Sequence, residues 1–118
     1  MVDRNLIGRN AEQLAYDFLK KKGFKLLQQN YRCYQGEIDL IMQDKEETVF
    51  IEVRSKNRAD FCSAVESITD AKQRKIIRTA THYLQKQNTL DTTPCRFDVI
   101  GIDGNNVEWI KDAFNYDG

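Results

Sequence analysis

The sequence predicts a mixed α/β domain in which a mixed β-sheet of about five strands is flanked by helices. Two segments carry apolar residues at helical spacing, and several others alternate apolar with polar residues as strands do. The predicted order is a helix, three strands, a helix and two strands, which is typical of helices packed on a sheet. The 118 residues, 41% hydrophobic and 31% charged, suit a single domain over residues 1–118.

The first helix is expected from Gly8 to Lys22. Its apolar residues follow the i, i+3, i+4, i+7, i+8 spacing of an amphipathic helix: Ala11, Leu14, Ala15, Phe18 and Leu19. Gly23 follows three lysines and is a suitable helix stop. Residues 24–33 are expected to form the first strand, although their apolar pattern is mixed.

The next two strands are expected at Glu37–Gln43 and Thr48–Arg54, where apolar residues alternate well. Turns are predicted before them at residues 34–36 and between them at residues 44–47. One face of the earlier strand should carry Ile38, Leu40 and Met42. One face of the later strand should carry Val49, Ile51 and Val53.

The second half of the chain predicts one long helix and two strands. After a polar loop, a short helix is expected at Ala64–Ile68 and a long one from about Thr69 to Gln87, with Thr69 as N-cap and Asp70 at the positive end. Its buried stripe should contain Ile76, Ile77, Ala80, Tyr83 and Leu84. The last strands are expected at Phe97–Ile102 and Val107–Ile110, joined by a turn at residues 104–106.

Composition restricts the partners and the compartment. There are 18 basic and 18 acidic residues, so contact with a nucleic acid would need a local basic patch. The start is too polar for a signal peptide, and no apolar run reaches membrane-spanning length, so no membrane partner is expected. The dispersed Cys33, Cys62 and Cys95 disfavour a zinc site and indicate a reduced, cytoplasmic protein.

Two acidic residues are expected to meet within the sheet. If the second and third strands form an antiparallel hairpin with a two- or four-residue loop, opposed residue numbers sum to 91. Asp39 then faces Glu52, and Glu37 faces Arg54. Opposed Cβ atoms lie roughly 4.5–5.5 Å apart, so the carboxylates of Asp39 and Glu52 would repel each other. A shared proton or a divalent cation such as Mg²⁺ or Mn²⁺ offsets that repulsion.

Two other interpretations compete with a metal site on the residues alone. The face could be exposed, so that both acids are merely solvated, although Ile41 and Phe50 share that face. Alternatively, Glu52 could form a structural ion pair with Arg54 or Lys56. The spacing by itself does not decide among the three.

Three motifs together resemble the bacterial YraN-like family over about Gly8 to Trp109. They are Gly36-Glu37-Ile38-Asp39-Leu40-Ile41, Val49-Phe50-Ile51-Glu52-Val53-Arg54 and Arg96-Phe97-Asp98-Val99. That largely uncharacterised family is assigned to the restriction-endonuclease-like superfamily with the PD-(D/E)xK motif, which also contains the archaeal Holliday junction resolvases. The resemblance implies a restriction-endonuclease-like fold and a metal-dependent nuclease.

The resemblance also implies a set of site residues. Asp39 matches the motif aspartate, Glu52 matches the acid of the (D/E)xK element, and Glu12 matches the helical glutamate of the resolvase-like branch. Without the resemblance, Glu12 would be interpreted as a solvated helix residue. Asp39, Glu52 and the Val53 carbonyl are expected to hold Mg²⁺ or Mn²⁺. In this arrangement the cation polarises the phosphate and activates a water molecule.

Two positions depart from the superfamily motif. Ile38 replaces the proline, which is harmless because the aspartate carries the chemistry. Arg54 occupies the lysine position, where it can stabilise negative charge but cannot act as a general base near neutral pH. Lys72, near the start of the long helix, is the better candidate for a replacement lysine, and Lys56 is another.

The implied activity is hydrolysis of phosphodiester bonds in DNA, in repair or recombination, and DNA suits it better than RNA. Basic residues expected to contact backbone phosphates are Arg58, Lys72, Arg74, Lys75 and Arg78. Such charges are also common on a solvated helix face. A homodimer with twofold symmetry would present two sites to the DNA.

Two other functions stay open. A non-catalytic nucleic-acid-binding protein could retain the nuclease fold. A partner-binding protein could use Trp109, Phe114 and Tyr116 as an interaction surface, although these aromatic residues equally suit the edge of the core. His82, alone in the long helix, is expected to be structural.

Overall fold

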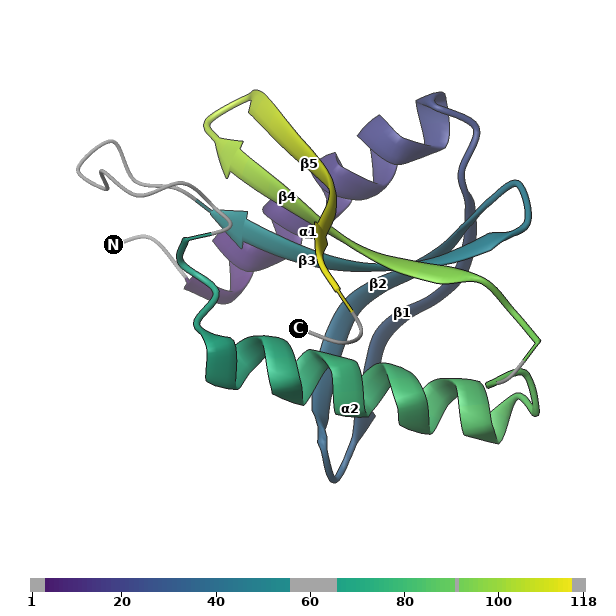
Figure 1. The fold of residues 1–118 in the computed structure, drawn as a ribbon. Helices are drawn as coiled ribbons and strands as arrows, with labels where there is room; N and C mark the ends of the chain where they lie inside the picture. The colour runs from purple at the N-terminus through teal and green to yellow at the C-terminus, as the bar shows by residue number, and fades with distance from the viewer. Residues whose placement is uncertain (1–3, 56–65, 91, 116–118) are drawn as a thin grey trace.

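The structure, a computed structural model, describes residues 4–55, 66–90 and 92–115 (Figure 1). The described elements follow the predicted order of a helix, three strands, a helix and two strands. They are α1 (Arg4–Lys21), β1 (Lys25–Cys33), β2 (Gly36–Asp44), β3 (Glu47–Ser55), α2 (Asp70–Lys86), β4 (Cys95–Asp103) and β5 (Asn106–Phe114).

The strands form one five-stranded sheet in the order β1-β2-β3-β4-β5. β3 and β4 are parallel, whereas the other neighbours are antiparallel. Parallel neighbours need a crossover connection, and α2 lies in that connection. The result is the predicted mixed sheet with flanking helices, and it is consistent with a restriction-endonuclease-like fold.

Each helix builds its own core against the strands (Figure 1). The α1 core contains Ala11, Ala15, Leu19, Leu40, Met42, Val49, Ile51 and Ile100, among others. The α2 core contains Ile41, Phe50, Ile76, Ala80, Tyr83, Leu84, Phe97 and Val99, among others. Because both faces of the sheet are covered, the inner strand β4 is buried along almost its whole length.

Several element boundaries differ from the sequence prediction. Helix α1 begins at Arg4 rather than at Gly8. Residues 66–68 form a turn and a bend, so the predicted short helix is wrong there, and its first residues, 64 and 65, lie outside the described residues. The N-cap of α2 is confirmed, since Thr69 Oγ1 accepts a hydrogen bond from the Lys72 backbone N–H at 3.3 Å.

Strand β5 extends to Phe114 instead of ending at Ile110. A register shift between Phe97 and Val99, together with Asp112 at φ 55°, lets the strand continue past an irregular point. The Asp112 backbone N–H, which the irregularity frees, donates to Asp98 Oδ1 at 2.9 Å.

The aromatic residues near the end of the chain pack into the two cores. Phe114 stacks on Phe97 with ring centroids 5.0 Å apart, and Trp109 contacts the rings of Phe18 and Phe24 edge to face. Trp109 and Phe114 therefore contribute to packing. Tyr116 lies outside the described residues.

The buried stripe of α2 differs from the prediction at two positions. Thr79 is fully buried, whereas Ile77 is only partly buried. The Thr79 hydroxyl can be buried because it donates to the Lys75 carbonyl at 2.8 Å.

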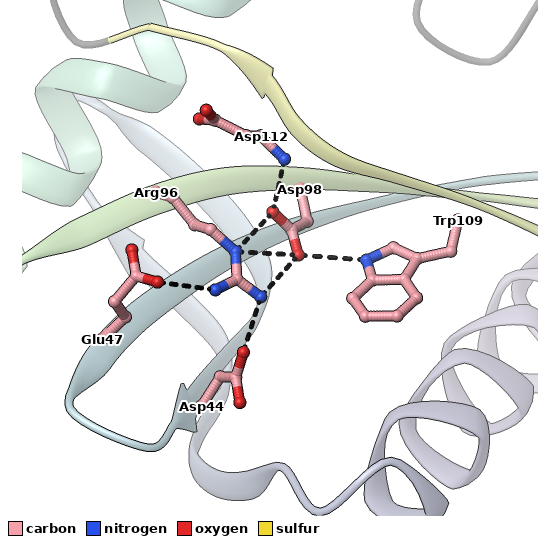
Figure 2. Close-up of polar contacts among 6 residues, drawn as sticks. All are labelled: Asp44, Glu47, Arg96, Asp98, Trp109 and Asp112. Carbon is pink, nitrogen blue, oxygen red and sulfur yellow. Dashed lines mark hydrogen bonds and ion pairs between the residues drawn. The ribbon is translucent and has the colours of Figure 1, made fainter.

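A buried ionic network joins the β2–β3 turn to the C-terminal strands (Figure 2). The Arg96 guanidinium, 5% exposed, contacts Asp44 at 3.1 Å, Glu47 at 2.9 Å and Asp98 at 3.1 Å. Asp98 is fully buried and also accepts from Trp109 Nε1 at 3.0 Å. Side chains from β2, β3 and β4 thus meet around one guanidinium group, and β5 joins the network through Trp109.

Candidate active site

The β2–β3 ladder has the predicted register but ends before the two acidic residues. Leu40 pairs with Ile51, and the following pairs as far as Asp44–Glu47 keep residue numbers that sum to 91. The turn has two residues, 45 and 46, which preserves the register expected for an even loop. On the N-terminal side of Leu40, β2 stays paired with β1. There both strands curve away from β3 and run across α2 (Figure 1).

The bend in β2 changes which face its side chains occupy. Leu40 and Met42 lie in the α1 core, whereas Ile38 lies with Ile41 in the α2 core. The predicted common face for Ile38, Leu40 and Met42 is therefore wrong at Ile38, because regular alternation does not survive a bend. Asp39 is the residue at which the face changes.

The Asp39 carboxylate lies where β2 and β3 separate. Its Oδ2 accepts a hydrogen bond from the Val53 backbone N–H at 2.9 Å. A side chain thus satisfies a strand N–H at the place where the backbone ladder has ended. This bond gives a physical reason for an aspartate inside a strand, and it holds the carboxylate beside β3.

Glu52, on β3, brings a second carboxyl group to Asp39. Burial, followed by the hydrogen bond and the charge of Asp39, raises the pKa of Glu52 to about 9, and the nearby Arg54 cation opposes the rise. Around neutral pH the Glu52 carboxyl therefore keeps its proton. Two adjacent carboxyl groups, one of which retains its proton because of burial and the neighbouring carboxylate, are suited to a divalent cation.

Glu12 reaches the same carboxylate from α1. Partial burial, then the charge of Asp39 and a hydrogen bond with it, raise the pKa of Glu12, while a hydrogen bond with Asn30 lowers it. Glu12 follows the buried Ala11 on the helix, at the flank of the packed stripe. The structure thus brings Glu12, Asp39 and Glu52 together.

Asn30 is a site residue that the sequence reasoning missed. It lies inside β1 with φ 50°, a left-handed conformation that asparagine tolerates better than most residues. Its neighbours Gln29 and Tyr31 pair with Leu40 and Ile38, which places Asn30 beside Asp39. The one available signal was the irregular apolar pattern of residues 24–33, which reflects this local distortion.

Two surface hollows differ in their chemistry. One of about 310 Å³ is lined by Glu12, Gln13, Gln29 and Asn30. It adjoins the acidic cluster, the group formed by Glu12, Asp39 and Glu52. The other, about 320 Å³, is lined by Gln85, Asn88, Leu90 and Thr92, a set without an ionisable side chain. Only the first has groups suited to acid–base or metal chemistry.

Arg54 lies two residues after Glu52 on β3. Its Nε is buried and has no hydrogen-bond partner among the described residues. An unpaired buried donor costs about 1–3 kcal/mol. The predicted pairing of Arg54 with Glu37 is wrong, because β2 has left β3 and Glu37 instead pairs with Arg32 at 3.2 Å.

The described residues do not form a preformed metal cage. In the described part of the chain, no group of three or more His, Cys, Asp or Glu side chains is arranged to hold a metal ion. A cation at Asp39 and Glu52 would therefore need further oxygen ligands, for which the Val53 carbonyl and water molecules are suitable.

The predicted basic residues of α2 are all at the surface. Lys72, Arg74, Lys75 and Arg78 are exposed, and Lys75 lies against the β1–β2 hairpin near Gly36. Arg58 and Lys56 lie outside the described residues. Neither described helix has the length and apolarity to cross a membrane.

Comparison with known proteins identifies close relatives over nearly the whole chain. The model of the family described as "Uncharacterised protein family UPF0102" matches residues 11–102, a range that includes the acidic cluster and Arg54. A UPF0102 protein of Nitrosococcus oceani is 50% identical over 111 residues, which cover 91% of this chain and 90% of the relative.

Two further relatives show similar coverage. A UPF0102 protein of Coxiella burnetii (strain RSA 493) is 49% identical over 108 residues, 91% of this chain and 90% of the relative. One of Legionella pneumophila (strain Corby) is 49% identical over 110 residues, 92% of this chain and 93% of the relative. The names of these relatives state no activity.

Proposed function

Because this chain belongs to the uncharacterised protein family UPF0102, the YraN-like family that its motifs resemble, we propose that it is a metal-dependent endonuclease acting on DNA. The observation that carries the proposal is the convergence of Glu12, Asp39 and Glu52 near the unpaired buried N–H of Arg54. Clustered carboxyl groups suit a divalent cation, and a guanidinium cation beside them suits the negative charge of a phosphate. The restriction-endonuclease-like resemblance supports the same chemistry.

Mg²⁺ or Mn²⁺ is assigned to Asp39, Glu52 and the Val53 carbonyl, because all of these donors are oxygen atoms. When bound, the cation supplies Lewis-acid polarisation of the phosphate and lowers the pKa of a water molecule. The hydrogen bond from Val53 N–H to Asp39 sets the orientation of that carboxylate in advance.

The other residues act on the water and on the developing charge. Glu12, which approaches Asp39 from α1, orients the attacking water by accepting a hydrogen bond. The Arg54 guanidinium, a cation beside Glu52, stabilises the negative charge that develops on the phosphate. Lys72 is the second candidate for that charge, because it lies in the first turn of α2 at the protein surface.

DNA contact is assigned to the exposed basic residues of α2. Lys72, Arg74, Lys75 and Arg78 would contact backbone phosphates, with Arg58 as a further candidate. A homodimer would place two such sites on one DNA molecule. We place the protein in the cytoplasm, a proposal supported by the free thiols of Cys33 and Cys95.

A cleavage assay with Mn²⁺ tests the proposal on linear duplex, single-stranded and branched DNA. The parent protein should cleave with Mn²⁺ and not with EDTA. Asp39→Asn and Glu52→Gln should each reduce cleavage by about 100-fold or more, because each removes a charged ligand while keeping the side-chain shape. Glu46→Gln, in the exposed β2–β3 turn, is the matched control and should cleave normally. Unchanged cleavage by Asp39→Asn and Glu52→Gln would exclude this mechanism.

A non-catalytic nucleic-acid-binding protein is the second candidate. Arg54 at the lysine position favours it, as does the lack of a three-ligand metal group among the described side chains. Calorimetric titration with Mn²⁺ distinguishes the two functions. Intact DNA binding without measurable metal binding would support the non-catalytic protein.

A further inference from the structure

The β1–β2 turn presents an aromatic side chain to solvent. Tyr34 and Gln35 form a two-residue turn between the paired residues Cys33 and Gly36. Tyr34 is 85% exposed, about twice the exposure of Leu26 at 39% and Leu27 at 42%, the other exposed large hydrophobic residues of the described chain. The proposed catalytic chemistry makes no use of this ring.

A chain of ring contacts anchors Tyr34 to the core. Its ring meets the His82 ring of α2 edge to face, with centroids 5.7 Å apart and planes at 86°. His82 Nδ1 is hydrogen-bonded to the Tyr31 hydroxyl at 2.5 Å, and the buried Tyr31 ring contacts Tyr83 at 5.2 Å. The exposed ring is thus pre-oriented, which lowers the entropy lost on binding a ligand.

The hairpin that carries Tyr34 is fixed against α2. Gly36 has φ +152°, and a Cβ atom there would lie 3.0 Å from Thr79 Oγ1. The Arg32–Glu37 ion pair, at 3.2 Å, bridges the two strands just before the turn. Figure 1 shows the tip of the hairpin projecting past α2.

Basic side chains of α2 flank the aromatic ring. Thr79 and His82, which contact the hairpin, share a helix face with Lys75 and Arg78, because residues three and four apart are neighbours on a helix. Lys75 and Arg78 are exposed, and the Lys75 backbone lies close to Gly36. The turn therefore presents an aromatic face beside two cationic side chains.

We propose that Tyr34 stacks on an unpaired base of a nucleic acid whose backbone lies along Lys75 and Arg78. In a duplex the bases are already stacked, so an exposed aromatic ring next to cationic residues is better suited to a single-stranded segment. The inference rests on the nucleic-acid-binding part of the proposed function. It assigns substrates with unpaired bases to this surface in preference to uniform duplex.

Fluorescence anisotropy in EDTA tests this inference without requiring cleavage. The probes are a labelled single-stranded oligonucleotide of mixed sequence and the duplex of the same sequence. Tyr34→Ala should weaken single-strand binding by about tenfold and duplex binding by less than about twofold, because only an unpaired base can stack on the ring. Tyr34→Trp should keep the single-strand affinity and show quenched indole fluorescence on binding. Leu27→Ala, an exposed apolar residue of β1, is the matched control and should bind normally.

Several outcomes would overturn the inference. An equal loss of affinity for both probes with Tyr34→Ala would show that the substitution disturbs the binding surface in general. Unchanged single-strand affinity would favour a protein partner for this ring. If Tyr34→Ala is poorly folded, failure of Tyr34→Trp to bind the single strand serves the same purpose. A parent protein that binds neither probe would overturn both this inference and DNA binding. Binding without Mn²⁺-dependent cleavage would overturn only the proposed enzyme.

Discussion

Glu52 lies mostly buried on β3, with the Asp39 carboxylate as its neighbour. Its pKa is raised from 4.5 to about 9, chiefly by burial and next by Asp39. Between these pH values the folded protein holds a proton that the unfolded chain has released. The free energy of unfolding of the metal-free protein should therefore fall as pH rises from about 4.5 to about 9.

Glu52→Gln should stabilise the metal-free protein, because the neutral amide needs no proton. In EDTA at pH 8 we expect a gain on the order of 1–3 kcal/mol, which shrinks toward pH 5. Urea unfolding at several pH values measures it, with Glu46→Gln as the exposed control. Adding Mn²⁺ should raise the Tm of the parent protein and leave that of Glu52→Gln nearly unchanged. A variant less stable than the parent at every pH in EDTA would contradict this account.

The β1–β2 hairpin depends on a close approach to α2. Gly36→Ala introduces a side chain at φ +152° and a Cβ 3.0 Å from Thr79 Oγ1. We expect a loss of about 2–4 kcal/mol in the free energy of unfolding, from backbone strain and steric contact together. Thermal or urea denaturation measures the loss.

Gly104 separates the two contributions to that loss. It also has a positive φ, +61°, but an added Cβ would meet no atom within 4 Å. Gly104→Ala should therefore cost about 1–2 kcal/mol, from backbone strain alone. Thr79→Ala should recover part of the Gly36→Ala loss by removing the contacted oxygen. Equal losses for both glycine variants, with no recovery, would show that the approach to α2 is not tight.

Four of the five strands, β2 to β5, are held together at one end by the Arg96 network (Figure 2). Arg96 contacts carboxylates that flank the β2–β3 turn as well as Asp98 on β4, and Asp98 binds β5 through Trp109. The network lies at the end of β2 away from Asp39, so its effect on the site is through the stability of the whole sheet.

Arg96→Met should destabilise the protein by on the order of 3–5 kcal/mol, because it leaves the Asp98 charge buried without its cation. The double variant Arg96→Met, Asp98→Asn should be more stable than the single one, since no uncompensated charge remains at position 98. Urea denaturation of the parent, both single variants and the double variant measures the coupling energy. A double variant whose loss equals the sum of the single losses would rule out a coupled pair.

The sequence was sufficient for much of the fold. Helical and strand periodicities predicted the order of elements, and even-loop hairpin geometry predicted the β2–β3 register from Leu40 to Asp44. Thr69 was also identifiable as an N-cap. These features depend on neighbours close along the chain, so local patterns carry them. The same patterns predicted that Asp39 and Glu52 lie on adjacent strands.

Other features depend on contacts between distant segments, and no local pattern encodes them. The Asp39 bond to Val53 spans 14 residues, and the Tyr31 bond to His82 spans 51. Both hydrogen bonds form where β1 and β2 bend away from β3 and pack against α2. That bend also moved Ile38 to the other face and Glu37 away from Arg54. Alternation assumes a straight strand, whereas packing of the hairpin on the helix determines where this strand turns.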